Sequence, residues 1–169
     1  MFALTRKTDY ALVALAAMAR LAERVSARDL ADRLSLPLPV LRNILKQLTQ
    51  EGLVSSTRGQ QGGYALARTP ERITVIDLIE AMEGPMRLTL CCMSEEDRER
   101  RRAASGGERH HCDLEGSCMI RRPVQHVHGL VRDLLSRVTL AQIARDEVPR
   151  EMDGFNTFVT KSHAMLGAR

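Results

Sequence analysis

The chain has 169 residues, which is enough for one domain with a short extension. Hydrophobic residues make up 44% and aromatic residues only 3%, with no Trp, so the composition favours a helical core and argues against a β-sandwich. The net charge of +4 permits a nucleic-acid partner. Because there is no apolar run of about 18 residues and no convincing signal peptide, we expect a cytoplasmic protein without a membrane span.

Three helices are expected at the start of the chain. The first covers residues 5–21 and has one apolar face, formed by Tyr10, Val13, Ala14, Ala17, Met18 and Leu21. The second begins at the N-cap Ser26, with Asp29 three residues later, and is broken by residues 35–39. The third spans residues 40–50, and its buried row is Val40, Leu41, Ile44, Leu45 and Leu48. Two short helices joined by a tight turn are typical of a helix-turn-helix.

A glycine-rich hairpin is expected directly after the third helix. Residues 53–56 and 64–67 are strand-like, and residues 57–63 between them contain Arg58 and three glycines. This order of elements is typical of a winged helix. Residues 37–70 hold four basic residues against a single acid, so we expect a DNA phosphate backbone to lie along this segment.

The second half of the chain carries a cysteine segment and a long helix. Thr74 and Asp77 predict the start of a helix that ends at Gly84, and residues 86–118 are interpreted as a long loop. This loop contains all four cysteines, which in a reducing cytosol are more typical of a metal or redox site than of disulfides. A last helix begins at Pro123, and it carries an apolar row formed by Val124, Val127, Val131, Leu134 and Val138. This row indicates either a dimerisation seam, which we favour, or an ordinary core helix.

Four stretches of the chain resemble one protein family, the iron–sulfur winged-helix regulators that include IscR and NsrR. They are LTRKTDYAL at residues 4–12, LVSSTRGQQGGYAL at 53–66, EAMEGPMRLTLC at 80–91 and HHCDLEGSCMIRRPVQHVHGLV at 110–131. The resemblance covers about residues 1–142 and is greatest to regulators of the SUF cluster-assembly operon.

The resemblance implies a mainly α fold with a small β-hairpin wing, divided into four parts. These are a winged helix-turn-helix DNA-binding domain at 1–84, a cysteine-bearing cluster loop at 85–118, a dimerisation helix at 119–142 and a polar C-terminal tail at 143–169. For DNA reading it implies residues of the third helix and of the wing, namely Arg42, Asn43, Lys46, Arg58, Gln60 and Gln61.

The resemblance also implies an iron–sulfur cluster, with [2Fe-2S] favoured over [4Fe-4S]. The expected ligands are the thiolates of Cys91, Cys112 and Cys118 and the acid Asp9, while Cys92 is either a substitute or a spare. His110 and His111 remain alternatives for the fourth ligand. The interval from Cys91 to Cys112 is longer than in the family's usual loop.

The function expected from these features is that of a homodimeric transcriptional regulator that binds a double-stranded DNA operator. It would sense iron–sulfur status, redox state or nitric oxide through the cluster and would control cluster-assembly genes. The alternative is a zinc- or thiol-redox-sensing regulator on the same fold, although the five residues between Cys112 and Cys118 argue against zinc. An enzyme is not expected, because no rigid strand–turn–helix surrounds a cysteine nucleophile.

Overall fold

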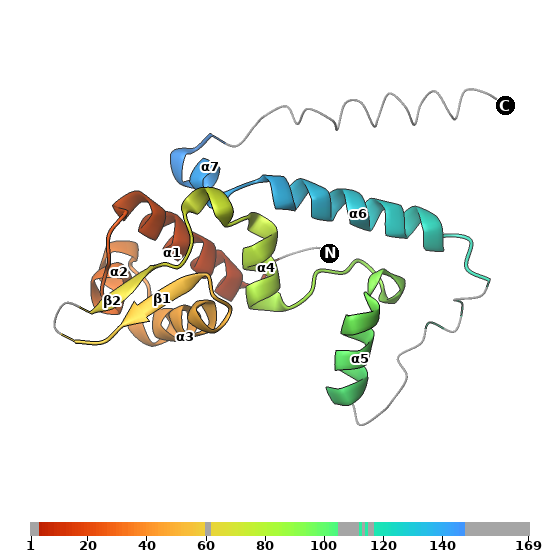
Figure 1. Ribbon diagram of the computed structural model, residues 1–169, viewed down its shortest axis with the longest axis horizontal. Coiled ribbons are helices and arrows are strands. Elements are labelled where there is room, and N and C mark those ends of the chain that lie inside the picture. Colours follow the sequence, from red (N-terminus) through yellow and green to blue (C-terminus); the bar gives the residue numbers. More distant parts are fainter. Residues whose placement is uncertain (1–3, 60–61, 105–111, 113, 115–116, 148–169) are drawn as a thin grey trace.

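The computed structural model describes residues 4–59, 62–104, 112, 114 and 117–147. Its elements are α1 (Arg6–Leu21), α2 (Ala27–Leu34), α3 (Leu38–Gln50), β1 (Val54–Thr57), β2 (Gly63–Leu66), the 3₁₀-helix η1 (Pro70–Arg72), α4 (Val75–Glu83), the 3₁₀-helix η2 (Leu90–Cys92), α5 (Glu95–Ala104), α6 (Arg121–Arg137) and α7 (Leu140–Arg145). This mainly helical architecture with one two-stranded hairpin confirms the expected fold class (Figure 1). In the described part of the chain, no helix is long and apolar enough to cross a membrane.

Helices α1 and α2 begin where a side chain satisfies one of the first backbone N–H groups. The Thr5 hydroxyl accepts from the Thr8 N–H, and the Ser26 hydroxyl accepts from the Asp29 N–H. Helix α3 begins at Leu38, two residues earlier than expected, because Pro39 fits the first turn of a helix. The three helices enclose a core whose fully buried side chains include Leu15, Leu30, Leu41, Ile44, Leu45 and Leu48. Burying each leucine stabilises the fold by roughly 1.5–3 kcal/mol.

Two residues expected in the core are exposed. Val13 of α1 keeps 47% of its surface in solvent, because the buried face of α1 is rotated toward Ala11, Ala14 and Leu15. Helix α1 contacts α3, α4 and α7, and this set of neighbours, which local periodicity does not reveal, decides which face is covered. Val40, in the first turn of α3, is 38% exposed, and Leu41 begins the buried row instead.

The hairpin pairs β1 with β2 in antiparallel register, from Val54 opposite Leu66 to Thr57 opposite Gly63. Both strands are within one residue of the expected ranges. Leu53 and Val54 are buried, and the Leu53 N–H donates to the Leu48 carbonyl at 2.9 Å, so the hairpin continues directly from the end of α3.

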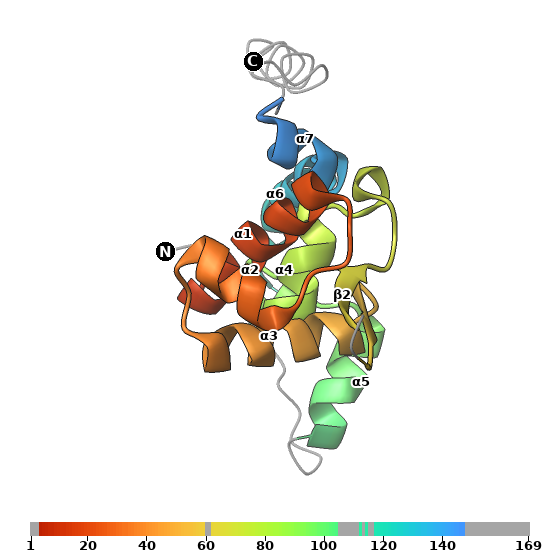
Figure 2. The same ribbon diagram turned by 90° about the vertical axis from the view of Figure 1, so that its left-hand side faces the viewer.

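The second half of the chain differs from the sequence interpretation in two places. The expected loop at 86–118 contains η2 and α5, and α5 is capped by Ser94, whose hydroxyl accepts from the Asp97 N–H at 3.1 Å. Helix α6 ends at Arg137, and α7 follows after the cap Thr139, so the segment expected as a polar tail from 143 begins inside a helix. Helix α7 returns to pack beside α1, as both ribbon views show (Figures 1 and 2).

The remaining expected tail, 148–169, lies outside the described residues, as do Gln60, Gln61, His110 and His111.

Candidate nucleic-acid interface and cysteine segment

Helix α3 presents a polar face opposite its buried row. The side chains of Arg42, Asn43 and Lys46 are exposed; Arg42 and Asn43 come from the N-terminal half of the helix, and Lys46 lies about one turn after Arg42. Exposed Arg, Asn and Lys side chains on the second helix of a helix-turn-helix are able to reach base edges and phosphates in a major groove. The structure therefore places these three predicted residues on one accessible surface, and their contacts with DNA stay a prediction.

Arg58 is exposed at the first position after β1. The backbone around it is tight: Gly59 has φ +115°, and a Cβ atom on Gly62 would lie 2.4 Å from the Thr57 carbonyl oxygen. Only glycine tolerates these two positions without movement of the backbone. The glycines therefore permit a close backbone approach at the base of the wing, and we expect such a slim hairpin to suit a minor groove.

One basic residue of this region is engaged within the protein. An Arg68 guanidinium nitrogen lies 3.7 Å from a carboxylate oxygen of Asp77, and both side chains are partly exposed. Such a pair contributes little to stability. It does, however, offset the charge of Arg68, so the positive character of the interface depends mainly on Arg42, Lys46 and Arg58.

A set of contacts that sequence reasoning missed connects α3 to the end of α4. The Gln47 amide donates to the Ala81 carbonyl at 2.7 Å and to the Met82 carbonyl at 3.3 Å. The same side chain accepts from the Lys7 ammonium group at 2.6 Å. Its partners are 34 to 40 positions away in the sequence, so no local motif reveals them.

The last residue of α4, Glu83, is bound to the start of α1. Its carboxylate accepts from the Thr5 hydroxyl at 2.7 Å, from the Thr5 N–H at 3.0 Å and from the hydroxyl of the fully buried Thr8. Hydrogen bonds from the side chains of Thr5 and Thr8 lower the pKa of Glu83 below its ordinary value, because they favour the charged carboxylate. Asp9, the predicted acidic ligand, is exposed one residue after Thr8.

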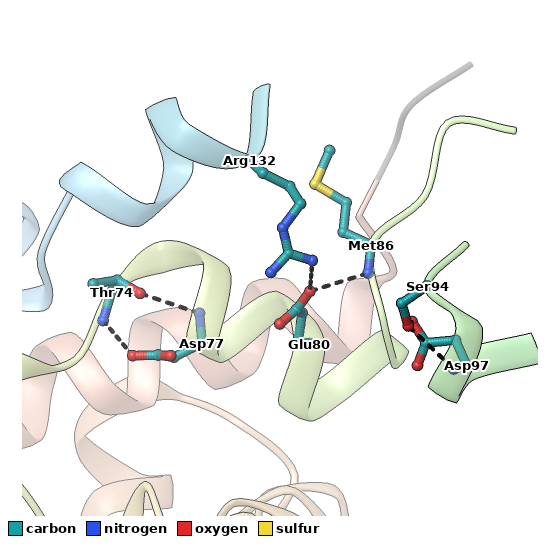
Figure 3. Close-up of polar contacts among 7 residues, drawn as sticks. All are labelled: Thr74, Asp77, Glu80, Met86, Ser94, Asp97 and Arg132. Atoms are coloured by element: carbon teal, nitrogen blue, oxygen red, sulfur yellow. Dashed lines mark hydrogen bonds and ion pairs between the residues drawn. The ribbon is translucent and has the colours of Figure 1, made fainter. Parts of the chain in front are cut away.

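A third connection joins α4 to α6 (Figure 3). Glu80 accepts from the Arg132 guanidinium at 2.5 Å and from the Met86 N–H at 3.4 Å. Nearby, the buried Nδ1 atom of His128 has no hydrogen-bond partner among the described residues. Burial, and secondarily the charge of Arg132, lower the pKa of His128, while Glu80 opposes the shift. His128 is therefore neutral at neutral pH and belongs to the contact between the two helices.

The first two cysteines lie in η2 against the beginning of α6. Their sulfur atoms are 3.1 Å (Cys91) and 3.3 Å (Cys92) from the same Thr89 hydroxyl oxygen. The Cys92 thiol also donates to the Val124 carbonyl at 3.9 Å, and the Gln125 amide donates to the Cys91 carbonyl at 2.8 Å. Cys92 is thus held on α6, while the sulfur of Cys91 contacts only its neighbouring threonine among the interactions found in the described segments.

The predicted ligands do not come together within the described part of one chain. Cys112 and Cys118 are half-buried free thiols, and no group of three His, Cys, Asp or Glu side chains is close enough there to bind a metal ion. The donor set nevertheless fits the expected cofactor chemically, because thiolates are the usual ligands of iron–sulfur clusters. The ligand assignment stays a prediction.

Comparison with known proteins places these features in context. The family model Rrf2, described as an iron-dependent transcriptional regulator, matches residues 4–146. The transcriptional regulator IscR of Xenorhabdus nematophila is 30% identical over 154 residues, which cover 89% of this chain and 80% of that protein.

Two solved structures are similar to this chain. The structure of T. potens IscR is 26% identical, with a TM-score of 0.56, covering 92% of this chain and 96% of that one. CymR, the global cysteine regulator of B. subtilis, has a TM-score of 0.61 over 86% of this chain and 98% of that one. At 24% identity, the CymR likeness shows the fold alone.

Proposed function

The chain belongs to the Rrf2 family of transcriptional regulators, and from that premise we propose that it is a homodimer that regulates transcription through an iron–sulfur cluster in its cysteine segment. The observation that carries this proposal is the contact of Gln47 on α3 with the last turn of α4. The cysteine segment begins immediately after that turn, so a change in the segment acts on the helix that we expect to read DNA. The family's members are regulators, and this chain is not an enzyme.

For DNA recognition, we assign α3 to the major groove and the wing to the minor groove. Arg42 is suited to a guanine edge and Asn43 to an adenine edge, whereas Lys46 is suited to a phosphate. Arg58 would enter the minor groove, with Gln60 and Gln61 as its neighbours in the wing. The exposure of all four described side chains supports this assignment.

For the cluster, we assign Cys91, Cys112, Cys118 and Asp9 as the ligands, with [2Fe-2S] as the favoured type. When bound, the cluster supplies a centre that oxidants, nitric oxide or iron shortage can remove. The hydrogen bond from Cys92 to the Val124 carbonyl supports a structural role for Cys92 and leaves Cys91 as the ligand. The genes of cluster assembly are the proposed targets, and the cytoplasm is the proposed location.

For the dimer, we assign α6 as the seam between two copies. None of its residues is buried in the single chain. Among its apolar side chains, Val127 is 48% exposed to solvent, and Ile120, just before the helix, is 63% exposed. Pairing with a second α6 would remove this apolar surface from water, which is a favourable change. Two DNA-binding heads would then face two half-sites of an operator.

A zinc- or thiol-redox-sensing regulator is the alternative, and one observation favours it. Cys91 and Cys92 are adjacent, and both sulfurs contact the same Thr89 hydroxyl. Two thiols held this close to one group are candidates for oxidation as a pair. An oxidisable thiol pair would respond to oxidants without any iron.

Anaerobic purification separates the two functions. We expect visible absorption above about 400 nm together with matching iron and sulfide contents, because Fe–S clusters have thiolate-to-iron charge transfer. Genomic DNA fragments captured by the loaded and cluster-free forms would then give the operator and the effect of the cluster. A colourless protein with stoichiometric zinc, or with thiol oxidation as the only reversible change, would contradict the cluster.

A further inference from the structure

We propose that Arg24 is a positioning residue for DNA recognition, because it joins the two ends of the wing loop and so sets the position of Arg58. This inference rests on the proposed role of the wing in DNA binding. Arg24 lies in the connection between α1 and α2, far from the wing in sequence. Its Nη1 atom donates to the Thr57 hydroxyl at 2.7 Å and to the Gly63 carbonyl at 3.2 Å.

These two acceptors occupy a special place in the hairpin. Thr57 and Gly63 are the last pair of the antiparallel register, so the chain between them is the wing loop, and Arg58 is its first residue. A single guanidinium group therefore bonds to both strands at the point where the loop leaves them. A planar, permanently charged donor is well suited to hold two acceptors at once.

The hairpin depends on such external support. It has only four residue pairs, and a short two-stranded hairpin is at best marginally stable alone. The residue after Arg24 supplies the second support: the Val25 N–H donates to the Tyr64 carbonyl at 2.9 Å, and the Tyr64 N–H donates to the Val25 carbonyl at 2.8 Å. The Arg24–Val25 dipeptide thus holds the β2 side of the wing through side chain and backbone together.

The close approach of this dipeptide is built into the sequence of β2. Gly63 has φ +147°, and a Cβ atom there would lie 2.6 Å from the Val25 carbonyl oxygen and 3.2 Å from Cγ of Arg24. Glycine at this position is what allows the Arg24 side chain to pass along the strand to Thr57. The hairpin and the α1–α2 connection are therefore fitted to each other.

A direct contact between Arg24 and a DNA phosphate is the competing explanation for any binding effect. The two roles differ in their dependence on Thr57, which carries no charge. If Arg24 acts through the wing, removal of the Thr57 hydroxyl reproduces its loss. If Arg24 binds a phosphate, Thr57→Val behaves as wild type, and only the Arg24 variant has a reduced salt dependence.

The test compares Arg24→Gln, Thr57→Val and the double variant in two measurements. The first is amide hydrogen exchange of residues 57–64 in the free protein. The second is the Kd for the DNA fragment that the wild-type protein selects from genomic DNA, measured over a series of salt concentrations. Arg20→Gln is the matched control, because it removes one charge four positions earlier, where the side chain donates to the Ala144 carbonyl of α7 and not to the wing.

We expect faster exchange in the wing and about tenfold weaker binding in each single variant, since a hydrogen bond of this kind contributes on the order of one factor of ten. The double variant should bind DNA no more weakly than Arg24→Gln does. Arg58→Ala should reduce DNA affinity by a smaller factor in the Arg24→Gln background than in the wild type. Arg20→Gln should leave wing exchange unchanged.

Three results would overturn the proposal: unchanged exchange in Arg24→Gln, weak binding in Arg24→Gln with wild-type binding in Thr57→Val, or faster exchange with unchanged affinity while Arg58→Ala still weakens binding. If Arg58→Ala itself binds as wild type, the proposed DNA role of the wing fails, and the positioning role for Arg24 fails with it.

Discussion

Replacement of Thr8 by valine should loosen the contact between the start of α1 and the end of α4. Thr8 is completely buried, and its hydroxyl donates to the carboxylate of Glu83. Valine has nearly the same shape, so packing is retained and the change removes mainly the hydrogen bond. A hydrogen bond to a charged group contributes about 1.5–3 kcal/mol, but Glu83 is exposed and keeps two bonds from Thr5, so we expect a loss of about 1 kcal/mol.

The pH dependence of this loss identifies its cause. The pKa of Glu83 is lower in the folded chain than its ordinary value of 4.5, so the stabilisation is complete above that value and disappears as the pH falls through the lower, folded-state pKa. The cost of Thr8→Val should therefore be present at neutral pH and should shrink in acid. Urea unfolding at neutral pH and at about pH 3 measures it.

Thr49→Val is the matched control for this experiment. Within α3, the Thr49 hydroxyl donates to the uncharged Leu45 carbonyl at 2.7 Å. Loss of this hydrogen bond should therefore lower the free energy of unfolding by the same amount at both pH values. A double variant with Glu83→Gln should show that the two changes at the α1–α4 contact are not additive. An equal cost of Thr8→Val at both pH values, or strict additivity with Glu83→Gln, would refute the reasoning.

Three further predictions concern DNA, the dimer and the cluster. Arg58→Ala should weaken operator binding by about 1–3 kcal/mol in fluorescence anisotropy, whereas the distant, exposed Arg145→Ala should not; equal affinities would remove Arg58 from the interface. Val127→Asp should give monomers in analytical ultracentrifugation, because pairing would bury an uncompensated carboxylate, and Ser136→Asp is the control from the same helix. A Val127→Asp protein that dimerises like the wild type would contradict the seam. Cys91→Ala should lose the visible absorption and iron that Cys92→Ala keeps, and the reverse result would exchange their roles.

Features that depend on neighbouring residues could be predicted from the sequence. Thr74 caps α4 together with Asp77, as expected, because an N-cap and its partner are three positions apart. The hairpin was predictable because its glycines and its flanking strands are adjacent in the chain. The third helix begins only two residues before its predicted start.

Helix α5 was missed because its residues have no apolar face. Residues 95–102 are all charged, and a helix is usually recognised in a sequence by its hydrophobic periodicity. Its determinants are of another kind: Ser94 caps the first turn, three acids occupy the positive end of the helix dipole, and Glu and Arg are good helix formers. These local determinants of α5 can be recognised in the sequence without hydrophobic periodicity.

The contacts that organise the candidate site could not be predicted because their partners are remote in sequence. Gln47 meets α4 across 34 positions, Arg24 meets Thr57 across 33, and Thr8 meets Glu83 across 75. Gln47, Arg24 and Thr8 are single polar residues, and the residues next to them in the chain do not indicate which distant residue each one contacts. Only the packing of α1, α3, α4 and the hairpin around one core brings these pairs together.

Helix α4 lies where it would transmit a change from the cysteines to DNA under the proposed function. Its end is bonded to α3 through Gln47, its side is bonded to α6 through Glu80 and Arg132, and the cysteine segment leaves from its last residue. Helix α6 also contacts Cys92 at its start, so the cysteines and the proposed dimer seam share one element. In the proposed dimer, a change in the cysteine segment that moves α6 against α4 would therefore alter two quantities together: the attachment of each proposed recognition helix to α4 and the spacing of the two DNA-binding heads. Because a dimer requires its half-sites about one helical turn apart, a small change in that spacing is sufficient to alter operator affinity.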